Sequence, residues 1–236
     1  MSARLVKLSP AALLFCLACG APIPAFDAGI DASSDAAVSD SGVPDAGPRD
    51  AGAGPFAARV VSFDAGAGAG FGNPQLVFGP PQGGGDCLGS FDVLSLGNGG
   101  EIILALDDLL VSDGPGVDLL VFENAFVGFI ETGAVAVSDD GATWHEWPCA
   151  ADDPDAGYPG CAGVHPVYSS TASGISPTDP LVAGGDGFDL ATLGLTHARY
   201  VRIRDSGKNR YVPTSGGFDL DAIAVVHPLR PDGGPW

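Results

Sequence analysis

Basic side chains are scarce in this chain of 236 residues: 10 lysines and arginines stand against 29 aspartates and glutamates, a formal net charge of −19. A nucleic-acid backbone needs a basic protein face, so this charge balance argues against nucleic-acid binding. Glycine (36) and proline (20) are abundant, and both are unfavourable inside helices, which argues against a helical bundle. The hydrophobic share of 45% is nevertheless large enough for a folded core.

The apolar run near the N-terminus, residues 11–18, is too short to cross a bilayer, which takes about 20 apolar residues. It follows Arg4 and Lys7 and ends in small residues, a pattern typical of a secretory signal peptide. Together with Cys19, the run resembles the lipobox of bacterial lipoproteins, in which that cysteine becomes the lipidated first residue. We therefore expect a signal peptide at 1–18 and an exported protein anchored through a lipid at Cys19 in the cell envelope, at the outer membrane or cell surface. Plain secretion and an uncleaved anchor are the alternatives.

Residues 19–55 contain few large apolar side chains, and the triplet Asp-Ala-Gly recurs there at Asp27, Asp45 and Asp50. Such a segment cannot bury enough surface to offset the entropy lost on ordering. We expect a disordered acidic tether without a binding role, followed by one domain at 56–228 and a short tail at 229–236.

The domain at 56–228 is built from short apolar runs separated by Gly, Pro, Asn and Asp, without a capped helical stripe of twelve or more residues. Many short strands joined by glycine-rich turns are typical of an all-β sandwich or barrel. The clearest predicted strands are 59–63, 101–106, 117–123, 133–138, 143–147, 199–204 and 219–226.

Two of these runs carry a family resemblance. The segment 135–144, VAVSDDGATW, reads as a strand–turn–strand hairpin, because Gly141 can take a positive φ in a tight turn. With the later run 198–204, ARYVRIR, it resembles discoidin-like, galactose-binding-like domains; the blocks at 113–118, 121–124 and 217–222 are similar to blocks in bacterial cell-surface proteins of that shape. The resemblance implies a jelly-roll-type, two-sheet antiparallel sandwich of eight strands, often with a structural calcium, that recognises sugars, lipids or proteins through its loop tips.

Cysteine usage agrees with export. If Cys16 leaves with the signal peptide and Cys19 is lipidated, three of the five cysteines remain. Cys149 and Cys161 bracket a loop rich in Pro, Gly and Asp, and we expect a disulfide between them that stabilises the fold by about 2–3 kcal/mol. This pairing leaves Cys87 as a free thiol; a pair that includes Cys87 is the alternative. Among these three cysteines Cys-x₂-Cys spacing is absent, which argues against a zinc site.

Carboxylates in apolar strands are the main functional candidates. A strand period of two places Asp219 and Asp221 on one face with Ile223 and Val225. A buried carboxylate needs a cation or hydrogen-bond donors. Arg202 and Arg204 are one solution, as ion-pair partners across the sheet. Calcium, which takes six to eight oxygen ligands, is the other. Its candidate ligands are Asp113, Asp118, Glu123, Asn124, Asp219 and Asp221.

Two further segments have both a structural and a functional interpretation. In 184–190, Phe188 and Leu190 plug the core while Asp186 and Asp189 cap turns, or the two aspartates form a second oxygen-rich loop. Near the cystine loop, aromatic rings either pack in the core or stack on sugar rings. These rings belong to Trp144, Trp147 and Tyr158.

Catalytic motifs are absent from the sequence: it contains no Gly-x-Ser-x-Gly elbow, His-Glu-x-x-His, P-loop or dinucleotide fingerprint. We therefore expect a recognition module rather than an enzyme, attached to the membrane by its lipid and directed at a glycan or an envelope partner. A structural envelope protein without a small ligand is the first alternative. A carbohydrate-active enzyme that uses Glu123 and Glu131 is the second.

Overall fold

The computed structural model of the chain describes residues 54–70, 72–90, 92–208, 217–234 and 236. The expected signal peptide, the lipidation site at Cys19 and nearly all of the expected tether lie outside these residues. Within the described residues, the structure contains no helix with the length and apolar character needed to cross a membrane.

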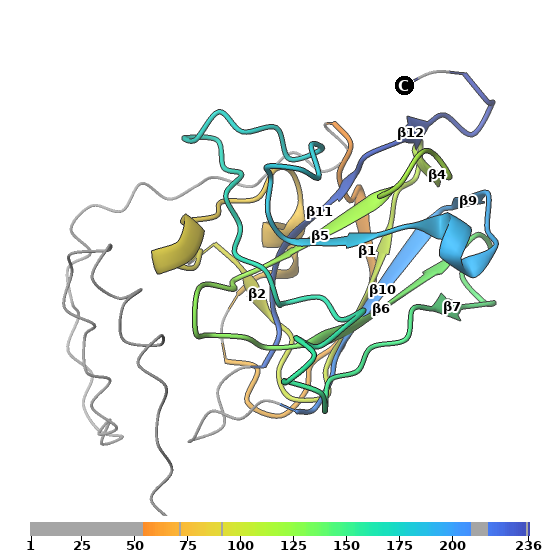
Figure 1. The fold of residues 1–236 in the computed structure, drawn as a ribbon. Helices are drawn as coiled ribbons and strands as arrows, with labels where there is room; N and C mark the ends of the chain where they lie inside the picture. Colours follow the sequence, from red (N-terminus) through yellow and green to blue (C-terminus); the bar gives the residue numbers. More distant parts are fainter. Residues whose placement is uncertain (1–53, 71, 91, 209–216, 235) are drawn as a thin grey trace, which may run out of the picture. The chain divides into compact units, whose positions relative to one another are not determined.

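The described residues form three antiparallel sheets and no α-helix, so the predicted all-β sandwich class is confirmed (Figure 1). The five-stranded sheet has the order β1 (Arg59–Asp64), β3 (Glu101–Ala105), β10 (Tyr200–Asp205), β6 (Gly133–Ser138) and β7 (His145–Glu146). The four-stranded sheet has the order β2 (Leu94–Ser95), β11 (Asp219–Val225), β5 (Leu119–Glu123) and β8 (Asp186–Phe188). The smallest has the order β12 (Pro228–Leu229), β4 (Leu110–Ser112) and β9 (His197–Ala198). Three short 3₁₀ helices connect strands: η1 (Pro74–Val77), η2 (Gly85–Cys87) and η3 (Leu190–Leu193).

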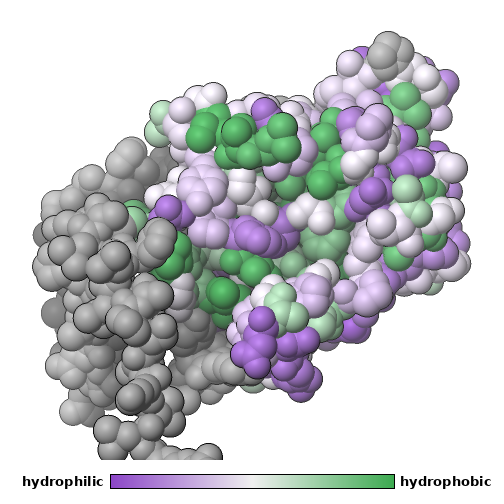
Figure 2. All heavy atoms as spheres, in the orientation of Figure 1, coloured by the Kyte–Doolittle hydropathy of each residue, from purple (hydrophilic) through white to green (hydrophobic). Residues whose placement is uncertain are grey.

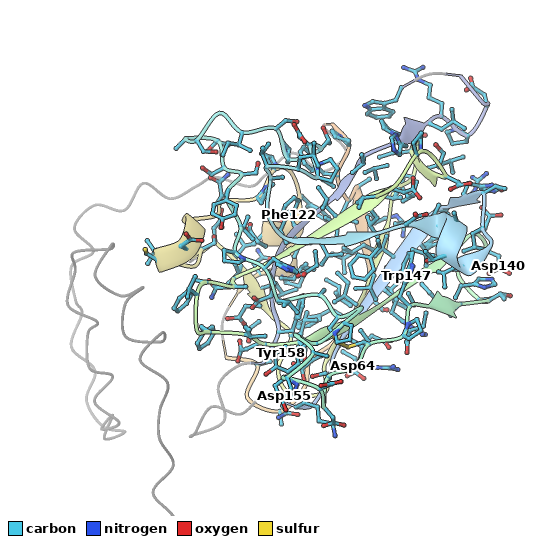
Figure 3. The ribbon with its side chains drawn as sticks, in the orientation of Figure 1. Asp64, Phe122, Asp140, Trp147, Asp155 and Tyr158 are labelled. Carbon is cyan, nitrogen blue, oxygen red and sulfur yellow. A yellow bond between two sulfur atoms is a disulfide. The ribbon has the colours of Figure 1, made fainter. Side chains whose placement is uncertain are left out.

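The main core lies between the two larger sheets. Leu104 and Ile203 of the five-stranded sheet share one buried cluster with Val121 and Ile223 of the four-stranded sheet. A smaller cluster lies on the other face of the four-stranded sheet and includes Phe122 (Figure 3). Because β5 and β11 are buried on both faces, a carboxylate in either strand has little access to water.

A β-bulge in β11 corrects the predicted alternation of its side chains. The register against β5 shifts between Leu220 and Ala222, so Asp221 is an extra residue. As a result Leu220, Ile223 and Val225 face the main core together. The prediction that Asp219 and Asp221 share a face with Ile223 and Val225 is therefore wrong.

All seven predicted strands are present, and the predicted hairpin joins β6 to β7. Gly141 has a φ of +72° in its turn. The Asp140 carboxylate accepts hydrogen bonds from the N–H groups of Ala142 and Thr143 (Figure 3). The five strands that the sequence pattern did not indicate, β2, β4, β8, β9 and β12, are each two or three residues long, too short to show a period of two.

Candidate metal centre

Three oxygen-bearing side chains meet where β5 ends and β11 begins. Glu123 and Asp219 are 1% and 6% exposed, and Asn124 directly follows Glu123. The Asp219 N–H donates to Glu123 Oε1 at 3.2 Å, and Asn124 Nδ2 donates to Asp219 Oδ2 at 3.5 Å. The Asn124 N–H donates to the Asp219 carbonyl at 3.2 Å. The antiparallel pairing of β5 with β11 thus brings the three side chains together.

Each of these side chains keeps one oxygen without a hydrogen-bond partner. Glu123 Oε2, Asn124 Oδ1 and Asp219 Oδ1 are buried and accept no hydrogen bond. Among the described residues, no lysine, arginine or histidine forms an ion pair with Glu123 or Asp219. Burying a carboxylate without a positively charged partner costs several kcal/mol of folding free energy, and two such carboxylates lie together here.

The pKa values of Glu123 and Asp219 reflect their burial and the lack of nearby positive charge. Burial, followed by the nearby charges of Asp219 and Glu131, holds the pKa of Glu123 well above its usual range. Burial also raises the pKa of Asp219 to about 6. Both acids therefore resist ionisation unless positive charge is brought to them.

Other buried aspartates show that burial alone does not leave an oxygen unpaired here. Asp205 accepts the N–H groups of Gly99 and Gly207 on Oδ1 and that of Phe218 on Oδ2. Asp118 accepts the N–H groups of Gly114 and Leu190, one on each oxygen. Both oxygens of Asp205 and of Asp118 accept backbone N–H groups, whereas Glu123 Oε2 and Asp219 Oδ1 accept none.

The predicted ion pairs with arginine are not formed. Arg202 and Arg204 lie in β10 of the five-stranded sheet, and both contact Glu146. β11, which carries Asp219 and Asp221, belongs to the other large sheet. The interpretation of these arginines as partners of Asp219 or Asp221 is therefore wrong, because the two strands are in different sheets.

The six candidate calcium ligands do not converge on one point. Asp118 precedes β5 and Glu123 ends it, about 16 Å away at 3.3 Å per residue. Asp113, Asp118 and Asp189 instead have oxygens within 4.8 Å of one another. Asp221 Oδ2 accepts the Gln82 N–H at 2.7 Å. Of the six described candidates, Glu123, Asn124 and Asp219 are the ones that are linked to one another by hydrogen bonds and that also keep buried oxygens without a hydrogen bond.

A glycine-rich loop packs against Asn124, one of the three residues of the centre. A Cβ atom on Gly89 would lie 1.6 Å from Asn124 Oδ1 and 2.5 Å from the Asn124 carbonyl oxygen. Any other residue at this position would collide with the asparagine. The loop between η2 and β2 can therefore approach the centre only with glycine at position 89.

The three predicted stacking aromatics have different environments. Trp147 is 6% exposed, packs on Phe188 and donates from Nε1 to Thr192 Oγ1 at 2.9 Å (Figure 3). A ring held in the core cannot stack on a ligand, so the prediction is wrong for Trp147. Trp144 is partly exposed, with the Arg202 guanidinium 4.7 Å from its ring centroid. Tyr158 is partly exposed in the cystine loop.

The segment 184–190 follows the structural interpretation. Phe188 and Leu190 are buried in the main core. Asp189 caps η3 by accepting the Ala191 N–H, and Asp186 accepts the N–H groups of Gly163 and Val164.

The disulfide between Cys149 and Cys161 is present, as predicted, with a Cα–Cα distance of 4.5 Å. Cys87 is disulfide-bonded as well. The expectation of a free thiol at Cys87 is therefore wrong.

A histidine–aspartate pair was not anticipated from the sequence. His165 Nδ1 lies 2.7 Å from Asp186 Oδ1, with the imidazole 69% exposed and the carboxylate 6% exposed. The pair joins a loop to β8, 21 residues later, and no local spacing marks it.

Comparisons with known proteins assign no family to the chain. No family model matches it, and no curated protein matches it. Among solved structures, it is similar to the C-terminal domain of a chitobiase from Bacteroides fragilis, with 14% sequence identity and a TM-score of 0.35. That similarity covers 71% of this chain and 91% of the other.

Proposed function

We propose that this chain is an exported recognition module whose loop end is organised by a calcium ion held by Glu123, Asn124 and Asp219. The observation that carries this proposal is the set of three buried oxygens, one on each side chain, that accept no hydrogen bond. Carboxylate and amide oxygens are the ligands that calcium takes, and two carboxylates supply the charge that a divalent ion requires.

The ion would contribute structure and not chemistry. It would offset the repulsion between Glu123 and Asp219 and join the end of β5, the start of β11 and the loop around Gly89. Backbone carbonyls of that loop and water would complete the six to eight oxygens that calcium needs. Such a centre fixes loops, and fixed loops suit recognition.

Thermal unfolding of the full chain tests the ion. Calcium at about 100 times its dissociation constant stabilises a folded protein by about 2.7 kcal/mol, which raises Tm by roughly 5–10 °C for a domain of this size. Asp219→Asn should abolish this rise. The metal-free variant should be at least as stable as the metal-free wild type, because it no longer buries that charge.

Asp205→Asn is the matched control. Asp205 is 3% exposed, but its oxygens are occupied by backbone N–H groups. This variant should lose about 1–3 kcal/mol with or without calcium and keep a calcium-dependent rise in Tm, slightly reduced because the charge of Asp205 also acts on Asp219. If neither calcium nor a chelator changes the Tm of the wild type, the proposed calcium ion is ruled out.

Export and lipid attachment at Cys19 form the second part of the proposal, supported by the N-terminal sequence pattern. Once Cys16 has left with the signal peptide, a lipid on Cys19 and the disulfide of Cys87 require the same cysteine, because Cys149 and Cys161 bond to each other. The mass of the mature protein decides between the two. Mass spectrometry of the mature protein should find a chain that begins at Cys19 and carries the added mass of a diacylglyceryl group. An unmodified N-terminus at another residue would contradict the anchor.

A further inference from the structure

One edge strand of the described sheets is much longer than the others. The three sheets end in β1, β7, β2, β8, β12 and β9. Five of these strands have two or three residues, whereas β1 has six. A strand at the edge of a sheet carries N–H and C=O groups without a strand partner, and proteins commonly keep such edges short. The long edge at β1 is therefore a candidate interaction surface.

The outer side of β1 is accessible to a further strand. Among the described residues, β3 is the one strand that pairs with β1. Four of the six residues of β1 are exposed, including the apolar Val61 at 46%. In an antiparallel pair the backbone groups of alternate residues point away from the partner strand. Those of β1 can therefore bond to a second strand on its outer side.

A β-bulge in β1 places two opposite charges on the same face of the sheet. Arg59 and Asp64 are five positions apart, a spacing that puts side chains on opposite faces of a regular strand. The register against β3 shifts at Val61, which is an extra residue. Arg59 lies opposite Ala105 of β3, and Asp64 lies opposite Glu101, four positions earlier in β3. Because residues four positions apart share a face, Arg59 and Asp64 share one as well.

Asp64 has an acid beside it and no cation partner. Asp64 and Glu101 are directly opposite each other, and like charges in such a pair are destabilising. Glu101 has a cation nearby, since its Oε2 lies 3.7 Å from Arg202 Nε. Among the described residues, no lysine, arginine or histidine forms an ion pair with Asp64. A cation supplied by another molecule would relieve this repulsion.

The residues of β1 are complementary to themselves in the antiparallel direction. When Arg59 of one copy is opposite Asp64 of another, Val60 is opposite Phe63. Val60 and Phe63 both pack against the main core, so this apolar pair lies on the inner face. The charged pair lies on the outer face. A two-fold axis through the middle of the two strands repeats both pairs, as in other symmetric dimers.

The distribution of charge also favours contact at this sheet. Two copies with a net charge of −19 repel each other. Six lysines and arginines lie in the described part of the chain, and four of them belong to β1 or β10 or directly precede β10: Arg59, Arg199, Arg202 and Arg204. On the face visible in Figure 2, hydrophobic side chains lie in separate groups between hydrophilic ones. Strand pairing needs no continuous apolar surface, because the backbone supplies its bonds.

We infer that β1 pairs in antiparallel orientation with β1 of a second copy of this chain, which joins the two five-stranded sheets into one. Arg59 of each copy contacts Asp64 of the other. Contact along six residues buries less surface than the 1,200–2,000 Å² that is roughly typical of stable complexes, so the dimer is weak.

Sedimentation equilibrium of the full chain tests this pairing. Between about 1 µM and about 1 mM, the average mass should rise from that of the monomer towards twice that value. Arg59→Asp puts like charges opposite each other at both ends of the pair and should weaken dimerisation by about tenfold or more. Asp64→Arg should weaken it similarly. The double variant, Arg59→Asp with Asp64→Arg, restores opposite charges and should recover most of the wild-type dimerisation.

Two further variants are controls. Asp107 accepts a hydrogen bond from Arg59 at 2.9 Å within one copy. Asp107→Asn removes this ion pair at a residue with a φ of +49°, which asparagine tolerates, and should not weaken dimerisation. Arg230→Asp changes the net charge by as much as Arg59→Asp, but at an exposed residue outside β1. Its effect should be much smaller than that of Arg59→Asp.

Three results would overturn the inference. The first is a mass that stays at that of the monomer up to about 1 mM. The second is a dimer that both single charge reversals leave intact, because another surface then forms it. The third is a loss in both single variants that the double variant does not recover, because the two residues then do not face each other across the pair.

Discussion

Asp205 and Asp219 are buried to a similar extent, but their oxygens have different partners. The backbone around Asp205 directs three N–H groups at its carboxylate. Asp219 Oδ1 receives none. A hydrogen-bonded carboxylate needs no ion, whereas an unpaired one is stabilised only by a cation or a proton. Residue type and burial therefore do not distinguish a structural aspartate such as Asp205 from a candidate ligand such as Asp219; the number of donors at each oxygen does.

The His165–Asp186 pair is predicted to make a contribution to stability that depends on pH. The hydrogen bond to Asp186 raises the pKa of His165 above its ordinary 6.5. The folded state therefore holds this proton more tightly than the unfolded state. The resulting stabilisation is fully present below pH 6.5 and is lost as the pH rises through the raised pKa.

NMR titration of the His165 ring should show this raised pKa in the folded protein and the ordinary value in the urea-unfolded chain. In Asp186→Asn the ring faces an uncharged amide, so its pKa should fall to the ordinary value or below. A titration that is unchanged in Asp186→Asn would show that Asp186 does not hold the proton.

At the scale of elements, long strands were predictable and local irregularities were not. β5, β6 and β10 follow from continuous apolar or alternating runs, and the β6–β7 hairpin follows from the glycine in its turn. The bulge at Asp221 has no such pattern, because one extra residue in β11 depends on its pairing with β5. Because of this bulge, the side chains that follow Asp221 point to the opposite face of β11 from Asp219, and not to the same face as predicted.

The candidate metal centre was likewise predictable only in part from the sequence. Glu123 and Asp219 stood out in the sequence as acids within apolar strands, and the structure places them together. Asp113 and Asp118 stood out equally, but they lie at the opposite end of β5. Which acids share an end of a sheet depends on strand order and register. Strand order and register cannot be read from the local spacing of residues. The prediction that Arg202 and Arg204 pair with Asp219 or Asp221 was wrong for the same reason.

For the whole molecule, a net charge of −19 is a source of instability that any cation relieves in part. Screening of this charge must be separated from binding at Glu123, Asn124 and Asp219. Raising NaCl from about 10 mM to about 1 M shortens the Debye length from about 30 Å to about 3 Å. The metal-free protein should therefore melt at a higher temperature in high salt.

A calcium ion in contact with buried oxygens is screened far less than one that only neutralises the surface. Calcium should thus still raise the Tm of the wild type at about 1 M NaCl, whereas Asp219→Asn should respond to calcium only at low salt. Magnesium, which demands a tighter octahedral site, should act chiefly through screening and lose most of its effect in high salt. If the response of the wild type to calcium also disappears at about 1 M NaCl, the ion acts on the net charge and not at Glu123.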